Sequence, residues 1–326
     1  MMLPYLARLV CLCLAAFFLV HAALGLAVSL LTPIAVRFAV RMAPANGARL
    51  LLALRLLAPA FALFVVVGLC TPSYLYLEPK GAPEEMGLAC LVAAILSLSI
   101  WGWSIGRASQ AVVRSVRHAR QCRERSHEMR LPGERVAGWV IAGSAPCVML
   151  TGLFRRRIVI STGVVDALSA EELAAVVRHE RAHGVSYDNL KRLLVLLAPD
   201  IVPLRFGLRK LERAWAKMAE WAADDRASAG NTRRSLSLAA ALVRVARLGS
   251  VAPAPALATS LMADGADLSE RVDRLLHPVE RGVQGRHREP ILTASAGLLL
   301  TGAMAALMAQ PATLQSAHEW LELLIQ

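Results

Sequence analysis

Residues 169–190 read SAEELAAVVRHERAHGVSYDNL, and this stretch decides how the rest of the chain is interpreted. Ser169 is followed three residues later by Glu172, a spacing typical of a capping box at the start of a helix. The apolar run LAAVV then supplies one face of a helix that is predicted to end near Gly184. The stretch therefore predicts one capped helix with a buried side.

That helix carries His179-Glu180-Arg181-Ala182-His183, an H-E-x-x-H spacing. His179 and His183 are four residues apart and lie on one helix face, so both can direct an imidazole nitrogen at one ion. Glu180 lies beside them on the adjacent face. The other interpretation is a helix surface with two ordinary histidines. The apolar run directly before the motif argues for burial, and buried polar groups need partners, which a metal supplies.

A catalytic zinc ion needs a third protein ligand and an open position for water. A third histidine six residues after His183 would complete a longer motif, but that position is Asn189, and the next histidine is His277. The third ligand is therefore expected to be a carboxylate from a second helix. Glu220 and Asp224 are four residues apart in the helical pattern of residues 209–227. Glu220 can bind the metal, while Asp224 can accept the other N–H of a ligand histidine.

Four long stretches without Asp, Glu, Lys or Arg indicate a membrane protein, in a chain of 326 residues that is 56% hydrophobic. Each contains or approaches the ~20 apolar residues that a transmembrane helix needs. The four stretches lie between Arg8 and Arg37 and over residues 56–77, 86–106 and 290–318. Residues 193–204 are too short and too interrupted to span. The first stretch could instead be a cleaved signal peptide, although its apolar run is too long for a signal core.

The distribution of arginine predicts the topology. Loop 32–50 carries three arginines and no acidic residue, and six arginines lie between Arg107 and Arg125, whereas loop 71–85 has three glutamates and one lysine. The positive-inside rule then places the N-terminus outside, the long segment after residue 106 inside and the tail outside. The net charge of +12 is explained by this pattern, so no direct nucleic-acid binding is expected. None of the six cysteines forms a C-x-x-C pair, which excludes a cysteine zinc site of that kind.

The predicted fold class is α+β and mostly helical, with four transmembrane helices and a cytoplasmic domain that contains a small β-sheet. Three short β-rich segments, punctuated by glycine and proline, precede the histidine helix, and further helices follow it. The predicted strands lie in 134–143, 146–154 and 156–162, and the later helices cover 209–227, 233–247 and a segment ending at 270–276. The predicted domains are 1–106 with three transmembrane helices, 107–289 as the cytoplasmic domain, 290–310 as the fourth transmembrane helix and 311–326 as a short extracytoplasmic tail.

With these motifs in this order, the chain resembles the integral-membrane zinc metallopeptidases of the beta-lactam sensor-transducer family, which are gluzincins related to the heat-shock membrane proteases. The resemblance covers nearly the whole chain and rests on GLFRRRIVIST, LSAEELAAVVRHERAH, YDNL, EWAADD and ERVDRLL. It implies that His179, His183 and Glu220 bind one zinc ion, that Glu180 is the general base and that Asp224 supports a ligand. By analogy, the sheet edge near Cys147 to Leu153 would bind substrate as an added strand.

The resemblance implies a zinc metalloendopeptidase of a bacterial-type cytoplasmic membrane. It would cleave protein substrates at the cytoplasmic face, with a transcriptional repressor as the expected regulatory substrate. We expect the penicillin-binding domain of the sensors to be absent after the last span, and with it direct antibiotic sensing. A quality-control protease for damaged membrane proteins remains an alternative, as does a non-catalytic signal transducer, although an intact Glu180 argues against the latter. Tyr187 and Arg226 are weak candidates for stabilising the oxyanion.

Overall fold

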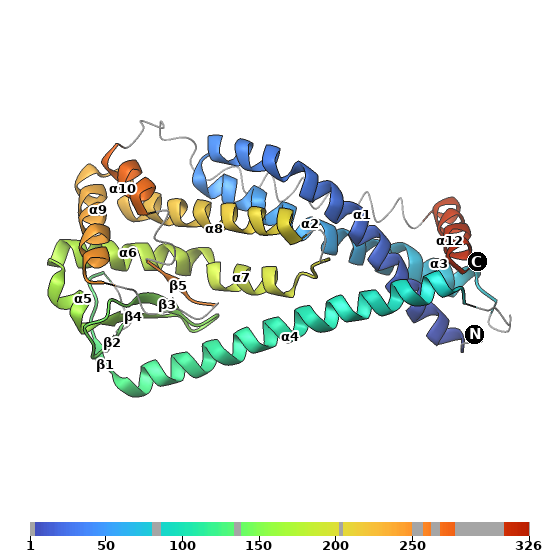
Figure 1. Cartoon of the computed structure of the whole chain (residues 1–326), viewed down its shortest axis with the longest axis horizontal. Helices are drawn as coiled ribbons and strands as arrows, with labels where there is room; N and C mark the ends of the chain where they lie inside the picture. Colours follow the sequence, from blue (N-terminus) through green and yellow to red (C-terminus); the bar gives the residue numbers. More distant parts are fainter. Residues whose placement is uncertain are drawn as a thin grey trace.

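A computed structural model describes residues 4–79, 86–133, 138–201, 205–249, 257–261, 268–277 and 310–325 (Figure 1). The chain is mostly helical, with one small sheet, as the sequence patterns predict. The helices are α1 (Tyr5–Arg41), α2 (Pro44–Val65), the π-helix η1 (Val66–Cys70), α3 (Thr71–Leu77), α4 (Leu88–Arg125), α5 (Thr162–Ala167), α6 (Ala170–Ser186), α7 (Asp188–Leu197), α8 (Arg205–Ser228), α9 (Thr232–Arg247), α10 (Leu268–Leu276) and α12 (Pro311–Ile325).

Three helical segments of the described chain are long and apolar enough to cross a membrane, namely Tyr5–Arg41, Pro44–Leu77 and Leu88–Arg125. Many of their large apolar side chains are exposed, as expected of surfaces that face lipid rather than water. The predicted fourth span at 290–310 lies outside the described residues. The third span continues beyond residue 106 as one helix, because α4 runs without a break to Arg125.

The predicted loop at 32–50 is wrong in its extent. Helix α1 continues to Arg41 and α2 begins at Pro44, so the connection is only two residues long. The arginines read as loop residues lie on the helices instead, because arginine favours helical conformation and charge alone does not end a helix. Pro44 occupies the first turn of α2, where its missing N–H has no intrahelical partner to lose.

The sheet has five strands in the order β1-β2-β4-β3-β5, where three were predicted. The predicted strands correspond to β2 (Gly138–Ile141), β3 (Val148–Thr151) and β4 (Arg157–Ser161). The two additional strands are β1 (Ser126–Met129) and β5 (Thr259–Ser260). They carry no apolar alternation of their own, since one extends the end of α4 and the other has only two residues.

Strand β5 changes the interpretation of the sheet edge near Cys147 to Leu153. Thr259 and Ser260 pair antiparallel with Leu150 and Met149, so β3 has a neighbour on both sides. In this conformation Met149 and Leu150 of the predicted substrate edge are already paired, so substrate binding at this edge stays a prediction. Their partners lie about a hundred residues later in the sequence, which no local pattern reveals.

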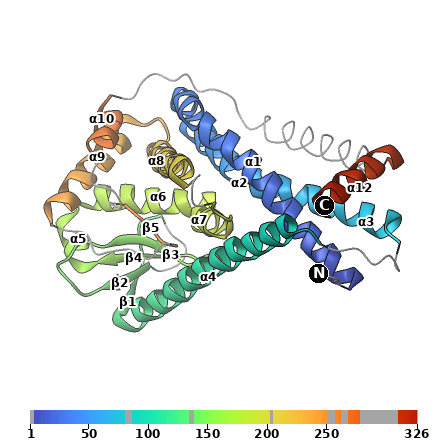
Figure 2. The same cartoon turned by 45° about the vertical axis from the view of Figure 1, so that its right-hand side comes forward.

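Helix α6 covers one face of the sheet, and α4 passes along the other side (Figure 2). The core between α6 and the sheet includes Leu150, Ile160 and Val176, which are at most 4% exposed. On the opposite side, Cys122 of α4 packs with Cys147 and Met149. The sheet is thereby fixed between the histidine helix and the continuation of a membrane helix.

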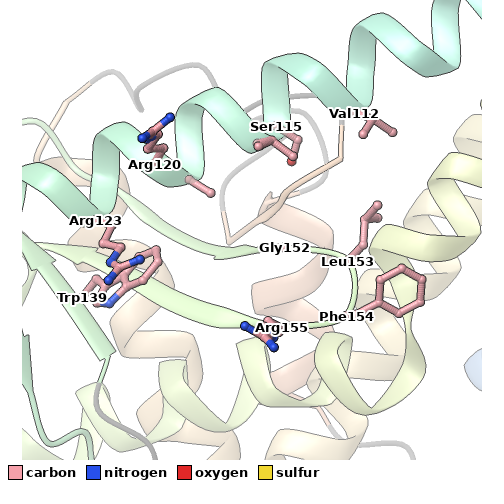
Figure 3. A pocket seen from close by; sticks show the side chains of 11 residues that line it. Val112, Ser115, Arg120, Arg123, Trp139, Gly152, Leu153, Phe154 and Arg155 are labelled. Carbon is pink, nitrogen blue, oxygen red and sulfur yellow. The ribbon is translucent and has the colours of Figure 1, made fainter.

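A hollow of about 760 Å³ opens where α4 diverges from the sheet (Figure 3). Its walls are largely apolar side chains of α4 and of the turn between β3 and β4, joined by Arg120, Arg123 and Arg155. None of the predicted metal-site residues lines it, although Gly152 and Leu153 of the predicted substrate edge do. This hollow is therefore separate from the histidine motif.

The tail predicted at 311–326 contains a helix. In α12, Leu321 is buried with the membrane helices, and Leu314 accepts a hydrogen bond of 2.8 Å from the Ser73 hydroxyl. Figure 1 shows α12 beside α3, at the end of the molecule opposite α6. Helix α12 therefore packs against the same end of the candidate membrane helices as α3.

Candidate metal centre

The local sequence builds α6 as predicted. Ser169 is the N-cap: its hydroxyl accepts a hydrogen bond from the Glu172 amide, and the Glu172 carboxylate accepts one of 2.8 Å from the Ser169 amide. The reciprocal bonds satisfy backbone donors that a helix start leaves free. Apolar side chains such as Val176 pack into the core, which carries the following two turns inward. The histidines are buried as a result.

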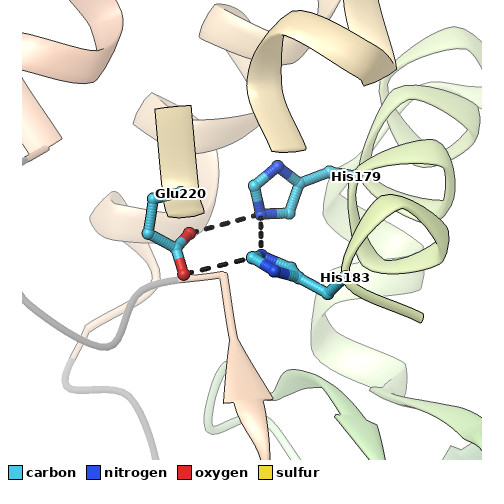
Figure 4. Close-up of side chains that lie close together, drawn as sticks. All are labelled: His179, His183 and Glu220. Carbon is cyan, nitrogen blue, oxygen red and sulfur yellow. Dashed lines mark hydrogen bonds and ion pairs between the residues drawn. The ribbon is translucent and has the colours of Figure 1, made fainter. Parts of the chain in front are cut away.

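The three predicted ligands lie together at one point (Figure 4). The Nε2 atoms of His179 and His183 are 3.1 Å apart. The carboxylate of Glu220 reaches both, with Oε2 lying 3.4 Å from His179 Nε2 and Oε1 lying 3.5 Å from His183 Nε2. Two imidazole nitrogens and one carboxylate oxygen are a donor set that suits zinc and leaves a fourth position for water or substrate.

Helix α8 brings Glu220 to this point. Ala219, Ala222 and Ala223 are nearly buried, and their small side chains allow α8 to pack closely against neighbouring helices, including α6. Earlier in α8, before Glu220, Leu211 and Trp215 pack with the α1–α2 hairpin. Helix α8 is therefore fixed by the membrane helices at one end and by the histidine helix at the other.

Each histidine has a carboxylate at its other ring nitrogen. Asp224, predicted for this role, lies with Oδ1 at 2.9 Å from His179 Nδ1. Asp188, which sequence reasoning missed, accepts a hydrogen bond of 2.8 Å from His183 Nδ1. Such partners fix the tautomer and orient the ring, so that both Nε2 atoms face the same point.

Asp188 reaches His183 because Tyr187 interrupts the helix with a single left-handed residue, after which the chain continues as α7 (Figure 1). This residue caps α6 in the left-handed conformation, with φ 57°, and Asp188 begins α7 immediately after it. The signal in the sequence is the acidic residue five positions after the second histidine, within the YDNL stretch. Asn189 is also buried, and its amide donates to the carbonyls of Leu150 and Gly152, which ties α7 to the sheet.

Arg271 of α10 is a second residue that sequence reasoning missed. Its guanidinium binds both oxygens of Asp224, at 2.9 and 2.8 Å, and its Nη1 lies 3.2 Å from Glu220 Oε2. Nη1 also donates to the carbonyl of Leu261, next to β5. The ERVDRLL segment was recognised only as an amphipathic helix, and nothing local indicated that its first arginine points inward.

The charges around the site keep its carboxylates ionised. Burial by itself would raise the pKa of Asp224, but Arg271 and His179 outweigh it and lower that pKa to about 2. Burial likewise opposes ionisation of Glu220, yet His183, His179 and Arg271 hold its pKa well below the usual range. Burial would lower the pKa of His183, but Glu220 and Asp188 raise it to about 10. In the metal-free site, protonated His183 therefore supplies the positive charge that a metal ion would otherwise supply.

Glu180 differs from the other two acids. It is fully buried, and within the described part of the chain its oxygens have neither a hydrogen-bond nor an ion-pair partner. The oxygens of Glu220 also lack hydrogen bonds, but they lie at ion-pair distance from both histidines and from Arg271. Burial raises the pKa of Glu180, and the nearby histidines only partly oppose this. A buried acid without a partner costs stability. Its presence here therefore indicates a functional role, such as binding water beside a metal. The donor set and this unpartnered acid together fit a catalytic zinc site.

The two weak oxyanion candidates lie away from this cluster. The Tyr187 ring is half exposed and stacks under the Arg156 guanidinium at 4.3 Å. The Arg226 guanidinium bonds the Ser186 hydroxyl and the carbonyl of Ala182, at the end of α6. Both therefore have structural partners, and Arg271 is the cation that faces the ligands.

Comparison with known proteins adds one finding to this geometry. No curated protein sequence matches the chain. Residues 120–252 match the sequence profile of Peptidase family M48, a match that contains α6 and α8 and stops before α10. A domain of this family indicates a metallopeptidase, which hydrolyses peptide bonds, and its presence beside three apolar helices is consistent with a membrane metalloprotease. The match to Peptidase family M48, together with the His-His-Glu cluster, supports a zinc metallopeptidase family for this domain.

Proposed function

We propose that this protein is a membrane zinc metalloendopeptidase that cleaves protein substrates at the cytoplasmic face. One observation carries the proposal: His179, His183 and Glu220 converge beside a buried, unpartnered Glu180. His179, His183 and Glu220 would hold the ion, and Asp224 and Asp188 would orient the two rings. A bound zinc ion would polarise the scissile carbonyl and lower the pKa of the attacking water.

The roles of the protein's own groups follow from their positions. Glu180 accepts the proton of the attacking water and then passes it to the leaving amine, which requires a base that is free of other partners. Arg271 holds Asp224 and Glu220 in place through three contacts and keeps their charge balanced when they are buried. It is also the cation nearest to the ligands, so it is our candidate for stabilising negative charge that develops on the substrate.

Access to the site requires a movement. His179 and His183 are at most 1% exposed, and β5 occupies the edge of β3. A substrate can add as a strand at this edge only after Thr259 and Ser260 have left it. A site that is closed in this way favours regulated cleavage of a specific substrate, such as a transcriptional repressor, over broad degradation of unfolded chains. The order of motifs along the chain likewise favours the sensor-transducer branch.

The cytoplasmic side is supported by the arginines that follow the third span. Arg107, Arg114, Arg117, Arg120 and Arg123 all lie on α4, and most are exposed. Moving such a run across an energised membrane is unfavourable, so the domain that follows it stays inside.

Zinc analysis and cleavage assays on the purified full chain test the proposal. The wild-type protein should contain about one zinc ion per chain and should cleave some members of a mixed peptide library, without broad digestion of a denatured protein such as casein. Removing the metal with a chelator should abolish cleavage, and adding zinc back should restore it. A protein that is folded but neither binds zinc nor cleaves would sink the proposal in favour of a non-catalytic transducer.

A further inference from the structure

Arg55 of α2 is a buried cation with partners on two other helices. Its side chain is 2% exposed. Nη2 lies 2.6 Å from Asp200 Oδ1, just beyond the end of α7, and Nε lies 2.6 Å from Glu212 Oε1 of α8. Nη2 also donates to the carbonyls of Val195 and Ala198, at 3.4 Å each. One side chain from a candidate membrane helix thus joins α7 to α8.

Two further membrane helices hold the same end of α7. Arg107 of α4 places Nη2 at 3.0 Å from Asp200 Oδ2 and donates to the carbonyl of Leu196. His21 of α1 lies with Nε2 at 3.2 Å from the carbonyl of Pro199. We name Arg55, Arg107, Asp200 and Glu212 the Arg55 cluster. Its two positive and two negative side chains balance, as buried ionic groups require.

Both helices joined by Arg55 lead to the metal centre. Helix α7 begins with Asp188, which accepts the hydrogen bond of His183, and ends three residues before Asp200. Helix α8 carries Glu212 and, eight residues later, Glu220, which at 1.5 Å per residue is ~12 Å along the axis. Figure 2 shows α7 between α4 and the pair formed by α1 and α2, as expected of an element held from several sides.

These ion pairs fix the positions of the membrane helices relative to α7 and α8. A buried charge needs each of its partners, so a membrane helix cannot shift past α7 or α8 without leaving a carboxylate or a guanidinium unpaired. Because α7 and α8 are regular helices, a movement at the Arg55 cluster is transmitted along α7 to Asp188 and along α8 to Glu220. We infer that the Arg55 cluster is a positioning device through which the membrane helices set the geometry of the metal centre. This inference rests on the proposed zinc site.

Zinc affinity of the full-length protein in detergent, measured by competition with a chromophoric chelator, tests the inference. Arg55→Met keeps length and apolar contacts but removes the charge, and Arg107→Gln, at a partly exposed position, removes one partner of Asp200 more gently. Each should weaken zinc binding, on the order of 10-fold for Arg55→Met, in the range seen for outer partners of metal ligands. Each should also shift the visible absorption of the cobalt-substituted protein, which reports ligand geometry. Arg55→Lys, which keeps the charge, should recover part of the affinity.

Arg8→Met is the matched control. Arg8 is also a buried arginine on a membrane helix, and it lies 3.6 Å from Glu78 at the end of the molecule that is distant from α6 (Figure 1). It should lower thermal stability but leave zinc affinity and the cobalt spectrum within about twofold of wild type, since its ion-pair partner is Glu78, just after α3, and not a residue of α7 or α8.

The outcomes separate the inference from the proposed function. Wild-type zinc affinity and an unchanged cobalt spectrum in folded Arg107→Gln and Arg55→Met proteins would overturn the inference, and so would equal losses in Arg8→Met. If Arg55→Met does not fold, then Arg107→Gln and Glu212→Gln decide in the same way, because both change partly exposed side chains. A wild-type protein that binds no zinc would instead overturn the proposed function.

Discussion

Replacing Glu180 by Gln separates a role in proton transfer from a role in metal binding. The side chain is fully buried, and its oxygens have no hydrogen-bond partner in the part of the chain that the structure describes. Glutamine has nearly the same shape but cannot accept the proton of the attacking water. We expect E180Q to keep its zinc and to lose peptide cleavage by ~10²–10⁴-fold, the usual contribution of a general base.

The same change should stabilise the metal-free protein. Burial raises the pKa of Glu180 above 4.5, although His179 and His183 oppose this. A carboxyl whose pKa is higher in the folded than in the unfolded state destabilises the fold once the pH exceeds the unfolded value. The penalty is absent below about pH 4.5, grows as the pH rises, and levels off above the folded-state pKa. Its full size is ~1.4 kcal/mol for each unit by which the folded-state pKa exceeds the unfolded-state pKa. The neutral amide has no such penalty.

Thermal unfolding of the chelator-treated proteins at pH 4.5 and pH 8 measures this effect, alongside zinc content and cleavage of a mixed peptide library. The two Tm values should coincide near pH 4.5, and that of E180Q should be higher at pH 8. A less stable variant at pH 8 would show that the carboxylate has a partner in the folded state. Loss of zinc would make Glu180 a ligand, and cleavage at the wild-type rate would remove it as the base.

Four further predictions concern the metal centre and its sidedness. Glu220→Ala should reduce bound zinc well below one ion per chain in elemental analysis, and unchanged metal content would move the third ligand elsewhere. Asp188→Ala should weaken zinc affinity ~10–100-fold in chelator competition, because His183 loses the group that orients it, and an affinity equal to wild type would contradict that role. Because Glu220 and Asp188 raise the pKa of His183 to about 10 despite burial, zinc must displace its proton. Affinity should then rise with pH between 6 and 9, with proton release in calorimetry, and a pH-independent affinity would count against this. In a cysteine-free background, exposed Val185→Cys should be shielded from impermeant thiol reagents in intact cells while exposed Tyr76→Cys is labelled, and the reverse pattern would invert the topology.

The choice of labelling position follows from burial. Ser73, in α3 at the end of the second candidate span, is fully buried and donates to the carbonyl of Leu314. A cysteine there would be protected on either side of the membrane, so Tyr76, in the same helix and 80% exposed, is the better reporter.

Local features of this protein were determined by the sequence itself. The capping box of Ser169 and Glu172 fixes where α6 begins, and the four-residue spacing fixes that His179 and His183 share a face. Long uncharged runs similarly predict the membrane helices, and the same spacing rule relates Glu220 to Asp224 on α8. These features depend only on helix periodicity and on the cost of placing charge in lipid, so neighbouring residues contain the information.

What only the tertiary structure decided are the contacts between segments far apart in the chain. Arg271 reaches Asp224 across 47 positions, and Thr259 closes the edge of β3 from more than a hundred positions away. Asp200, just beyond the end of α7, binds Arg55 of α2, which lies 145 positions earlier in the sequence. Helix packing and the need of each buried charge for an opposite charge determine such partners. Neither of these two factors produces a periodic pattern in the sequence. The candidate ligands could therefore be predicted from spacing, whereas the groups that hold, cover and connect them could be identified only once the chain was folded.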